Sequence, residues 1–149
     1  MNDKEFYDER QLQIRGNIYK RGFILLLIAL VVNGFLNSYG IVWAISFHQN
    51  FIIALAIVTV VGIEFHLRNV FFGKNSQALM VLVILGFVSI INIIFPIKHF
   101  LDGGSIAEES MLTDEGFSLV IVGLLFLNFI VGLIQYIRNR KQDKSEKEK

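Results

Sequence analysis

The sequence contains no cysteine, and only one proline and one tryptophan, in 149 residues. Without cysteine the chain cannot form disulfides, thiolate metal sites or a cysteine nucleophile. The one proline, Pro96, falls at the end of an apolar stretch, where a missing amide donor costs a helix least. The glycine-containing segment 73–76 has neither the spacing nor the preceding strand of a phosphate-binding loop. Disulfide, thiol and P-loop chemistry therefore have no basis in this sequence.

Signatures of other site chemistry are also missing. Ser46, Ser89 and Ser118 lack a nucleophile elbow and a paired histidine. The three histidines match no metal-ligand spacing, and a short basic tail alone does not indicate nucleic-acid binding. We therefore expect no enzymatic activity, no cofactor, no metal and no nucleic-acid partner.

Apolar residues make up 54% of the chain and occur in four long runs. They do not recur at the 3.6-residue spacing of a half-buried helix, which argues against a soluble domain. Each run, with its flanks, provides the ~20 residues that span the hydrocarbon core of a bilayer. The sequence predicts an all-α membrane protein with four transmembrane helices in two hairpins. This transmembrane domain, 21–137, has predicted spans at 21–39, 50–66, 78–96 and 117–137.

Positive charge is nearly absent from one side of the predicted membrane. When the four spans are threaded through a bilayer, thirteen of the fourteen lysines and arginines fall on the other side. The exception is Lys98, in an acidic external loop at 97–116. Because Lys and Arg are retained in the cytoplasm, both termini are predicted to be cytoplasmic in a multi-pass protein of the cell membrane.

The sequence also predicts a structure for each segment outside the spans. Residues 1–20 are predicted to form a cytoplasmic polar and amphipathic helix, with Asp3 as N-cap, that either lies on the membrane or extends the first span. Residues 138–149 are predicted to form a disordered basic cytoplasmic tail. Trp43 is expected to anchor the first external loop in the head-group layer. Thr113 is the expected N-cap of the fourth helix.

Glu64 is the one acidic residue inside a predicted span, and such a group is a functional candidate by default. It lies about fifteen residues into the second span, close to the cytoplasmic interface. Arg68 follows four residues later on the same helical face, an order that favours a Glu–Arg pair. An interfacial ion pair is therefore the preferred interpretation of Glu64, and a proton or cation site is the alternative.

Small and amide residues recur along the spans at helical spacing. The first span pairs Gly34 with Ser38 and Asn33 with Asn37; other stripes are Ala54, Val58 and Gly62; Gly86, Ser89 and Asn92; Gly116 and Gly123; and Asn128, Gly132 and Gln135. Small side chains let helices approach, and amides form hydrogen bonds between them. Helix packing is the preferred interpretation, with a polar permeation path as the alternative.

The N-terminal segment Asp8, Glu9, Arg10 and Gln11 is followed by a basic helix and then an apolar one. This layout resembles uncharacterised small bacterial four-helix membrane proteins that open with an Asp-Glu-Arg motif. Some of those proteins are thought to accompany small helix-turn-helix regulators. The resemblance implies four spans and short cytoplasmic ends, but no activity, ligand or catalytic residue. Physically, Asp8, Glu9 and Arg10 either dock a partner or form a solvated helix start.

Three classes of function follow. The leading hypothesis is an interaction or regulatory accessory protein of the membrane, with the lipid bilayer, a second copy or a membrane or cytoplasmic protein as partner. The alternative is a small transporter or channel subunit that uses Glu64. A membrane enzyme acting on lipid is the third class, although no motif for one is present.

Overall fold

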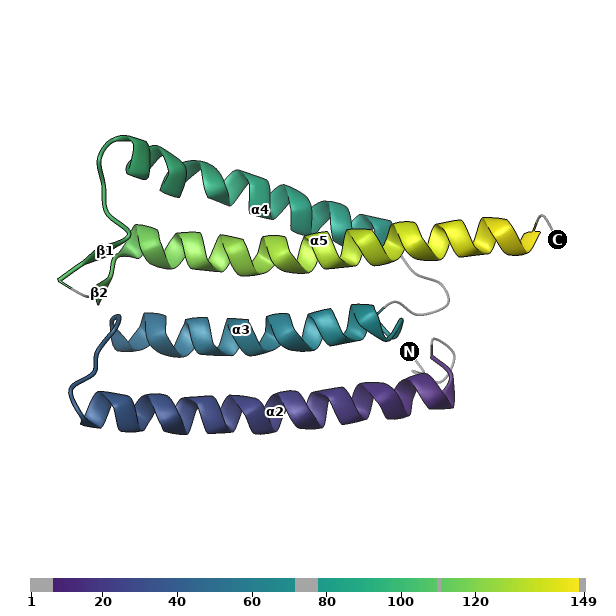
Figure 1. The fold of residues 1–149 in the computed structure, drawn as a ribbon, viewed down its shortest axis with the longest axis horizontal. Coiled ribbons are helices and arrows are strands. Elements are labelled where there is room, and N and C mark those ends of the chain that lie inside the picture. The colour runs from purple at the N-terminus through teal and green to yellow at the C-terminus, as the bar shows by residue number, and fades with distance from the viewer. Residues whose placement is uncertain (1–6, 72–77, 110, 148–149) are drawn as a thin grey trace.

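The computed structural model describes residues 7–71, 78–109 and 111–147. Within these ranges the chain forms four long helices and one short β-hairpin (Figure 1). The helices are α2 (Glu9–Ser38), α3 (Ser46–Leu67), α4 (Ala78–Leu101) and α5 (Asp114–Lys147). The antiparallel strands β1 (Ala107–Glu108) and β2 (Met111–Leu112) lie in the loop between α4 and α5. The prediction of an all-α fold with four helices, each long and apolar enough to cross a membrane, is confirmed.

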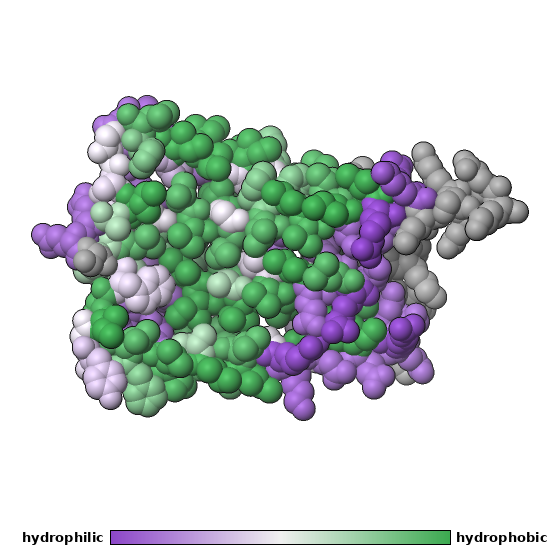
Figure 2. Space-filling model, in the orientation of Figure 1, coloured by the Kyte–Doolittle hydropathy of each residue, from purple (hydrophilic) through white to green (hydrophobic). Residues whose placement is uncertain are grey.

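The four helices stand side by side in an open row. Helix α2 packs on α3, α3 on α5, and α5 on α4, and no other pair of helices makes more than marginal contact within the described ranges (Figure 1). The first residues of α2 and the last residues of α5 lie at one end, which we call the inner end. The opposite end, with the β-hairpin, we call the outer end. An apolar band lies between these two more hydrophilic ends (Figure 2).

Helix α2 runs without interruption from the polar N-terminal region into the first predicted span. Asp8 is its N-cap: Gln11 N–H donates to Asp8 Oδ1 (2.6 Å), and Asp8 N–H donates to Gln11 Oε1 (3.3 Å), which completes a capping box. Residues 9–20 and the start of the first predicted span thus belong to one continuous helix. Asp3 lies outside the described residues.

Three helices end in the same kind of C-terminal motif. After α2 and α4, Gly40 (φ 77°) and Gly103 (φ 87°) take the left-handed conformation that ends a helix. After α3, Asn69 does so with φ 57°, and the N–H of Val70 donates to Phe65 O at 3.0 Å. Val70 and Phe65 are both buried in one apolar cluster, the side-chain contact that accompanies such an ending.

Two helix ends lie beyond their predicted positions. Pro96 lies inside α4, which continues to Leu101, so the loop between α4 and α5 is shorter than the predicted external loop at 97–116. Membrane helices tolerate an internal proline better than soluble helices do. Helix α5 begins as predicted, with Thr113 Oγ1 accepting from Gly116 N–H (3.1 Å), but its backbone stays helical to Lys147, where we expected disorder from Arg138. Arg, Lys, Gln and Glu have high helix propensity, and extending an existing helix costs little.

Candidate functional site

Glu64 lies at the inner end of α3 and contacts two arginines. Its Oε1 accepts from Arg68 Nε at 2.9 Å, the predicted pair, and from Arg21 Nη2 of α2 at 2.5 Å. The side chain of Glu64 is 26% exposed, and those of the two arginines are about half exposed. Ion pairs at this exposure contribute about 0–1 kcal/mol each. The carboxylate is therefore neutralised by two guanidinium groups, and it links α2 to α3.

The other predicted site residues lie apart from Glu64. Asp8 caps α2, Glu9 occupies its first turn, and the side chain of Arg10 is exposed on the next position. Arg21 lies thirteen residues beyond Asp8 in the chain, which corresponds to about 20 Å along the helix. The structure therefore separates the Asp-Glu-Arg segment from the Glu64 ion pairs. It gives Asp8 a local role in starting the helix.

A junction of three helices forms around the end of α3, at residues 68–71. Asn69 Oδ1 accepts from two amides of α5, those of Gln135 and of Asn139 (3.0 Å). Gln135 also donates to Asn139 Oδ1 at 3.1 Å. Because Asn69 tolerates the left-handed conformation, one residue both ends α3 and ties it to α5. We call Asn69, Gln135 and Asn139 the inner amide cluster.

Helix α2 joins this junction through Arg15. The guanidinium donates to Val70 O at 2.6 Å and lies 4.9 Å from the ring centre of Phe65 and 4.3 Å from that of Tyr7. It thereby satisfies a carbonyl at the end of α3 while stacking on aromatic faces. His66 stacks on Phe71 with ring centres 4.1 Å apart. Sequence reasoning did not predict this contact of Arg15, because a contact with residue 70 cannot be read from local spacing.

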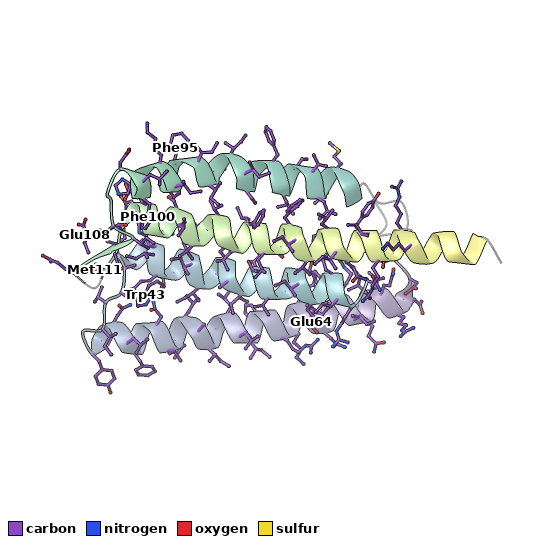
Figure 3. All side chains as sticks on the ribbon, turned by 45° about the horizontal axis from the view of Figure 1, so that its top comes forward. Trp43, Glu64, Phe95, Phe100, Glu108 and Met111 are labelled. Atoms are coloured by element: carbon purple, nitrogen blue, oxygen red, sulfur yellow. The ribbon has the colours of Figure 1, made fainter. Side chains whose placement is uncertain are left out.

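The outer end carries a second group of amides, between α2 and α3. Gln49 is fully buried; its Oε1 accepts from Asn37 (2.8 Å) and Asn33 (3.2 Å), and its Nε2 donates to Ala44 O (2.8 Å). Trp43 Nε1 donates to Asn33 Oδ1 at 3.1 Å. We call Asn33, Asn37, Trp43 and Gln49 the outer amide cluster. Figure 3 shows Trp43 and Glu64 toward opposite ends of the molecule.

Trp43 has a structural role that the sequence did not predict. Its indole N–H bonds to the protein, and its backbone O accepts from Leu112 N–H at 2.8 Å. It thus joins the first outer loop to the β-hairpin. The expected contact of the indole with lipid head groups stays a prediction. Sequence reasoning noted Asn33 and Asn37 but missed Gln49. Gln49 lies one turn into α3, opposite the end of α2, and an amide at that position could have been predicted to bond with the two asparagines.

The two histidines at the outer end differ in burial. His48 is buried, stacks on Phe117 of α5 at 3.8 Å between ring centres, and lies with Nε2 3.7 Å from Asp114 Oδ1. His99 lies 3.9 Å from Glu115 and is partly exposed. In the described part of the chain, no three His, Asp or Glu side chains are grouped to hold a metal ion.

The small-residue stripes divide into packed and open positions. Gly62 lies against Asn128, Gly86 against Phe129, and Gly132 against His66, so close that an added Cβ would be within 3 Å of these side chains. These glycines let α3 and α4 approach α5, as the packing interpretation predicts. Gly34 and Gly123 face open space instead. Their side of the helix is free to meet lipid or another helix.

The polar groups described above join neighbouring helices. Charged and amide side chains hold the helices together at both ends of the row, and the middle is apolar with tightly packed glycines. No curated protein and no solved structure matches the chain. A family model does match it over residues 1–149, and the chain belongs to that family, described as a family of unknown function (DUF6773).

Proposed function

We propose that this protein is an integral membrane protein that acts by association: it packs against another transmembrane protein or a second copy and has no enzymatic activity of its own. Both termini lie in the cytoplasm. The concentration of lysine and arginine toward the inner end, with Lys98 as the one exception in the sequence, supports this orientation.

The open row of helices carries the proposal. Among the described residues, helices α2 and α4 each make extensive contact with one neighbouring helix, so each keeps a long apolar face on its other side. Phe35 on α2 and Phe87 on α4 are 62% and 64% exposed on these faces. The apolar face of α2 includes Gly34, which faces open space and has no side chain, so the backbone of another helix can approach closely there. A closed four-helix bundle would cover such positions, whereas the edges of a row remain available for helices of another chain.

Transport through the chain itself has weaker support. Glu64 is already paired with Arg21 and Arg68 at the inner end. In the middle of the row, Ser89 and Asn128 donate to carbonyls of their own helices, at Leu85 and Leu124. The donor groups of these two side chains are therefore occupied within their own helices, which leaves them less free to bind a passing solute. If Glu64→Gln abolished a proton-coupled flux in vesicles without affecting insertion, the association proposal would lose its lead.

Site-specific cross-linking in native membranes tests the proposal. A photoreactive residue at position 35 or 87 should give a defined protein adduct, identified by mass spectrometry. The same residue at position 82, where Leu82 is buried, is the matched control and should cross-link only within the chain. In the second arm, Gly34→Leu should abolish the adduct at position 35 while leaving the adduct at position 87. Lipid adducts alone at both edges would refute association through this row.

The orientation has a separate test. A reporter fused after Gly103, in the loop that follows α4, should be active outside the cytoplasm, and one fused after Lys149 should be active inside. The reverse pattern would overturn the topology without touching the helix arrangement.

A further inference from the structure

The outer halves of α4 and α5 diverge, although their inner halves pack closely (Figure 1). In the inner half, a Cβ on Gly86 would lie 2.8 Å from the ring of Phe129. Pro96, in the outer half of α4, is buried and has no N–H to donate to the Asn92 carbonyl. The divergence leaves a cleft that is open at the outer end.

This outer cleft consists of three adjoining cavities of about 250, 420 and 390 Å³, which all have Pro96 in their walls. The cleft is charged at its rim and apolar below. The rim side chains are Lys98, His99, Asp102, Asp114 and Glu115. Below the rim the wall continues along α5 through Ile121, Val122 and Leu125.

The shape and polarity fit a membrane amphiphile better than a soluble ligand. The wall from Ser118 to Leu125 runs about 10 Å along α5 toward the middle of the apolar band. At the rim, three carboxylates outnumber one lysine, so a head group with an ammonium is favoured over one that is only anionic. Lys98 and His99 remain as donors for a phosphate beside that ammonium.

We propose that the outer cleft binds one amine-bearing phospholipid from the adjacent leaflet. Its ammonium donates to Asp102 and Glu115, its phosphate lies near Lys98, and an acyl chain packs along Val122 and Leu125. This inference goes beyond the proposed association, because the cleft lies between α4 and α5, away from the exposed faces of the row. The test below requires no protein partner and no particular orientation.

Native mass spectrometry of the full-length protein in detergent, titrated with lipid, tests the proposal. Phosphatidylethanolamine should bind about tenfold more tightly than phosphatidylcholine, whose quaternary nitrogen has no N–H to donate. Phosphatidylglycerol, which lacks the ammonium, should bind no better than phosphatidylcholine. Glu115→Gln should weaken phosphatidylethanolamine binding and reduce the difference between the two nitrogen-containing lipids.

Glu108→Gln is the matched control, because it removes the same charge from the same outer end. Glu108 lies on β1, accepts from Ser105, and does not line the cleft. It should leave lipid selectivity unchanged, whereas Ser118→Phe, which fills the cleft, should abolish selective binding. Equal effects of Glu115→Gln and Glu108→Gln would overturn the proposal. So would a preference for phosphatidylglycerol, or a dimer that Ser118→Phe dissociates while lipid binding persists.

Discussion

Gln49 should be a principal source of stability at the contact between α2 and α3. Replacing it with leucine keeps the size of the side chain but removes three hydrogen bonds, to Asn37, Asn33 and the carbonyl of Ala44. Side-chain hydrogen bonds between membrane helices contribute on average about 0.6 kcal/mol each, so Gln49→Leu should lower the free energy of unfolding by about 2 kcal/mol. Leucine is more apolar than glutamine, which would offset part of this loss of stability. However, Asn37 and the carbonyl of Ala44 would lose their hydrogen bonds to residue 49, and this cost keeps the loss at about 2 kcal/mol.

Trp43 provides the assay, because it is the only tryptophan in the chain and its indole N–H belongs to the same cluster. Unfolding in mixed micelles, followed by tryptophan fluorescence as the fraction of denaturing detergent rises, should show an earlier midpoint for Gln49→Leu. The native emission should also shift as Asn33 loses its alignment with the indole.

Asn50→Leu is the matched control, because Asn50 is the adjacent amide but is exposed and makes one long contact, 3.4 Å, to Asn33. Its effect on the unfolding free energy should stay below about 0.5 kcal/mol. Combining Gln49→Leu with Asn37→Ala should be less destabilising than the sum of the single changes, because both remove the same bond. If Gln49→Leu unfolds like the wild type, or if Asn50→Leu is equally destabilising, the outer amide cluster does not hold the hairpin together.

Three further changes probe other positions. Asp8→Ala should destabilise the first turn of α2 by about 1 kcal/mol, seen as faster hydrogen exchange there, and Asp8→Ser should restore protection. Gly62→Leu should cost about 1–3 kcal/mol, because its side chain meets Asn128, whereas Gly34→Leu, in open space, should leave the unfolding midpoint unchanged. Glu64→Gln should change the unfolding free energy by no more than about 1 kcal/mol; a larger loss would show that its ion pairs do more than exposed pairs normally do.

The number and type of the helices were predictable because a run of apolar residues long enough to cross a bilayer has few other stable structures. Their ends were less predictable. Composition changes at Ile137 and a proline stands at 96, yet the backbone hydrogen bonds continue past both, to Lys147 and Leu101. Where a specific side-chain bond marks the end, as with Thr113, the prediction was correct. A change from apolar to polar residues predicts where a span ends, but the helix can continue beyond that point.

The site residues divide in a similar way. The pair of Glu64 with Arg68 was predictable, because residues four apart on a helix always share a face. Arg21, which completes that group, lies 43 residues away in sequence, and Asn69 and Gln135 are separated by 66. Such contacts depend on which helices are neighbours. That order is a property of the whole fold, which no local spacing specifies.

The order of the helices also explains why the row does not close. In water, the apolar faces of α2 and α4 would have to turn toward each other, whereas in the bilayer that we propose lipid covers these faces at no cost, so apolar burial would not drive closure. Two other kinds of contact then determine which helices lie next to each other: close packing at glycines such as Gly62, and polar contacts at the two ends of the row. Those contacts join α2 to α3 and α3 to α5 on their facing sides. The outer edges of the row are therefore left without polar constraints, and a partner helix can pack there without breaking any bond that holds the protein together.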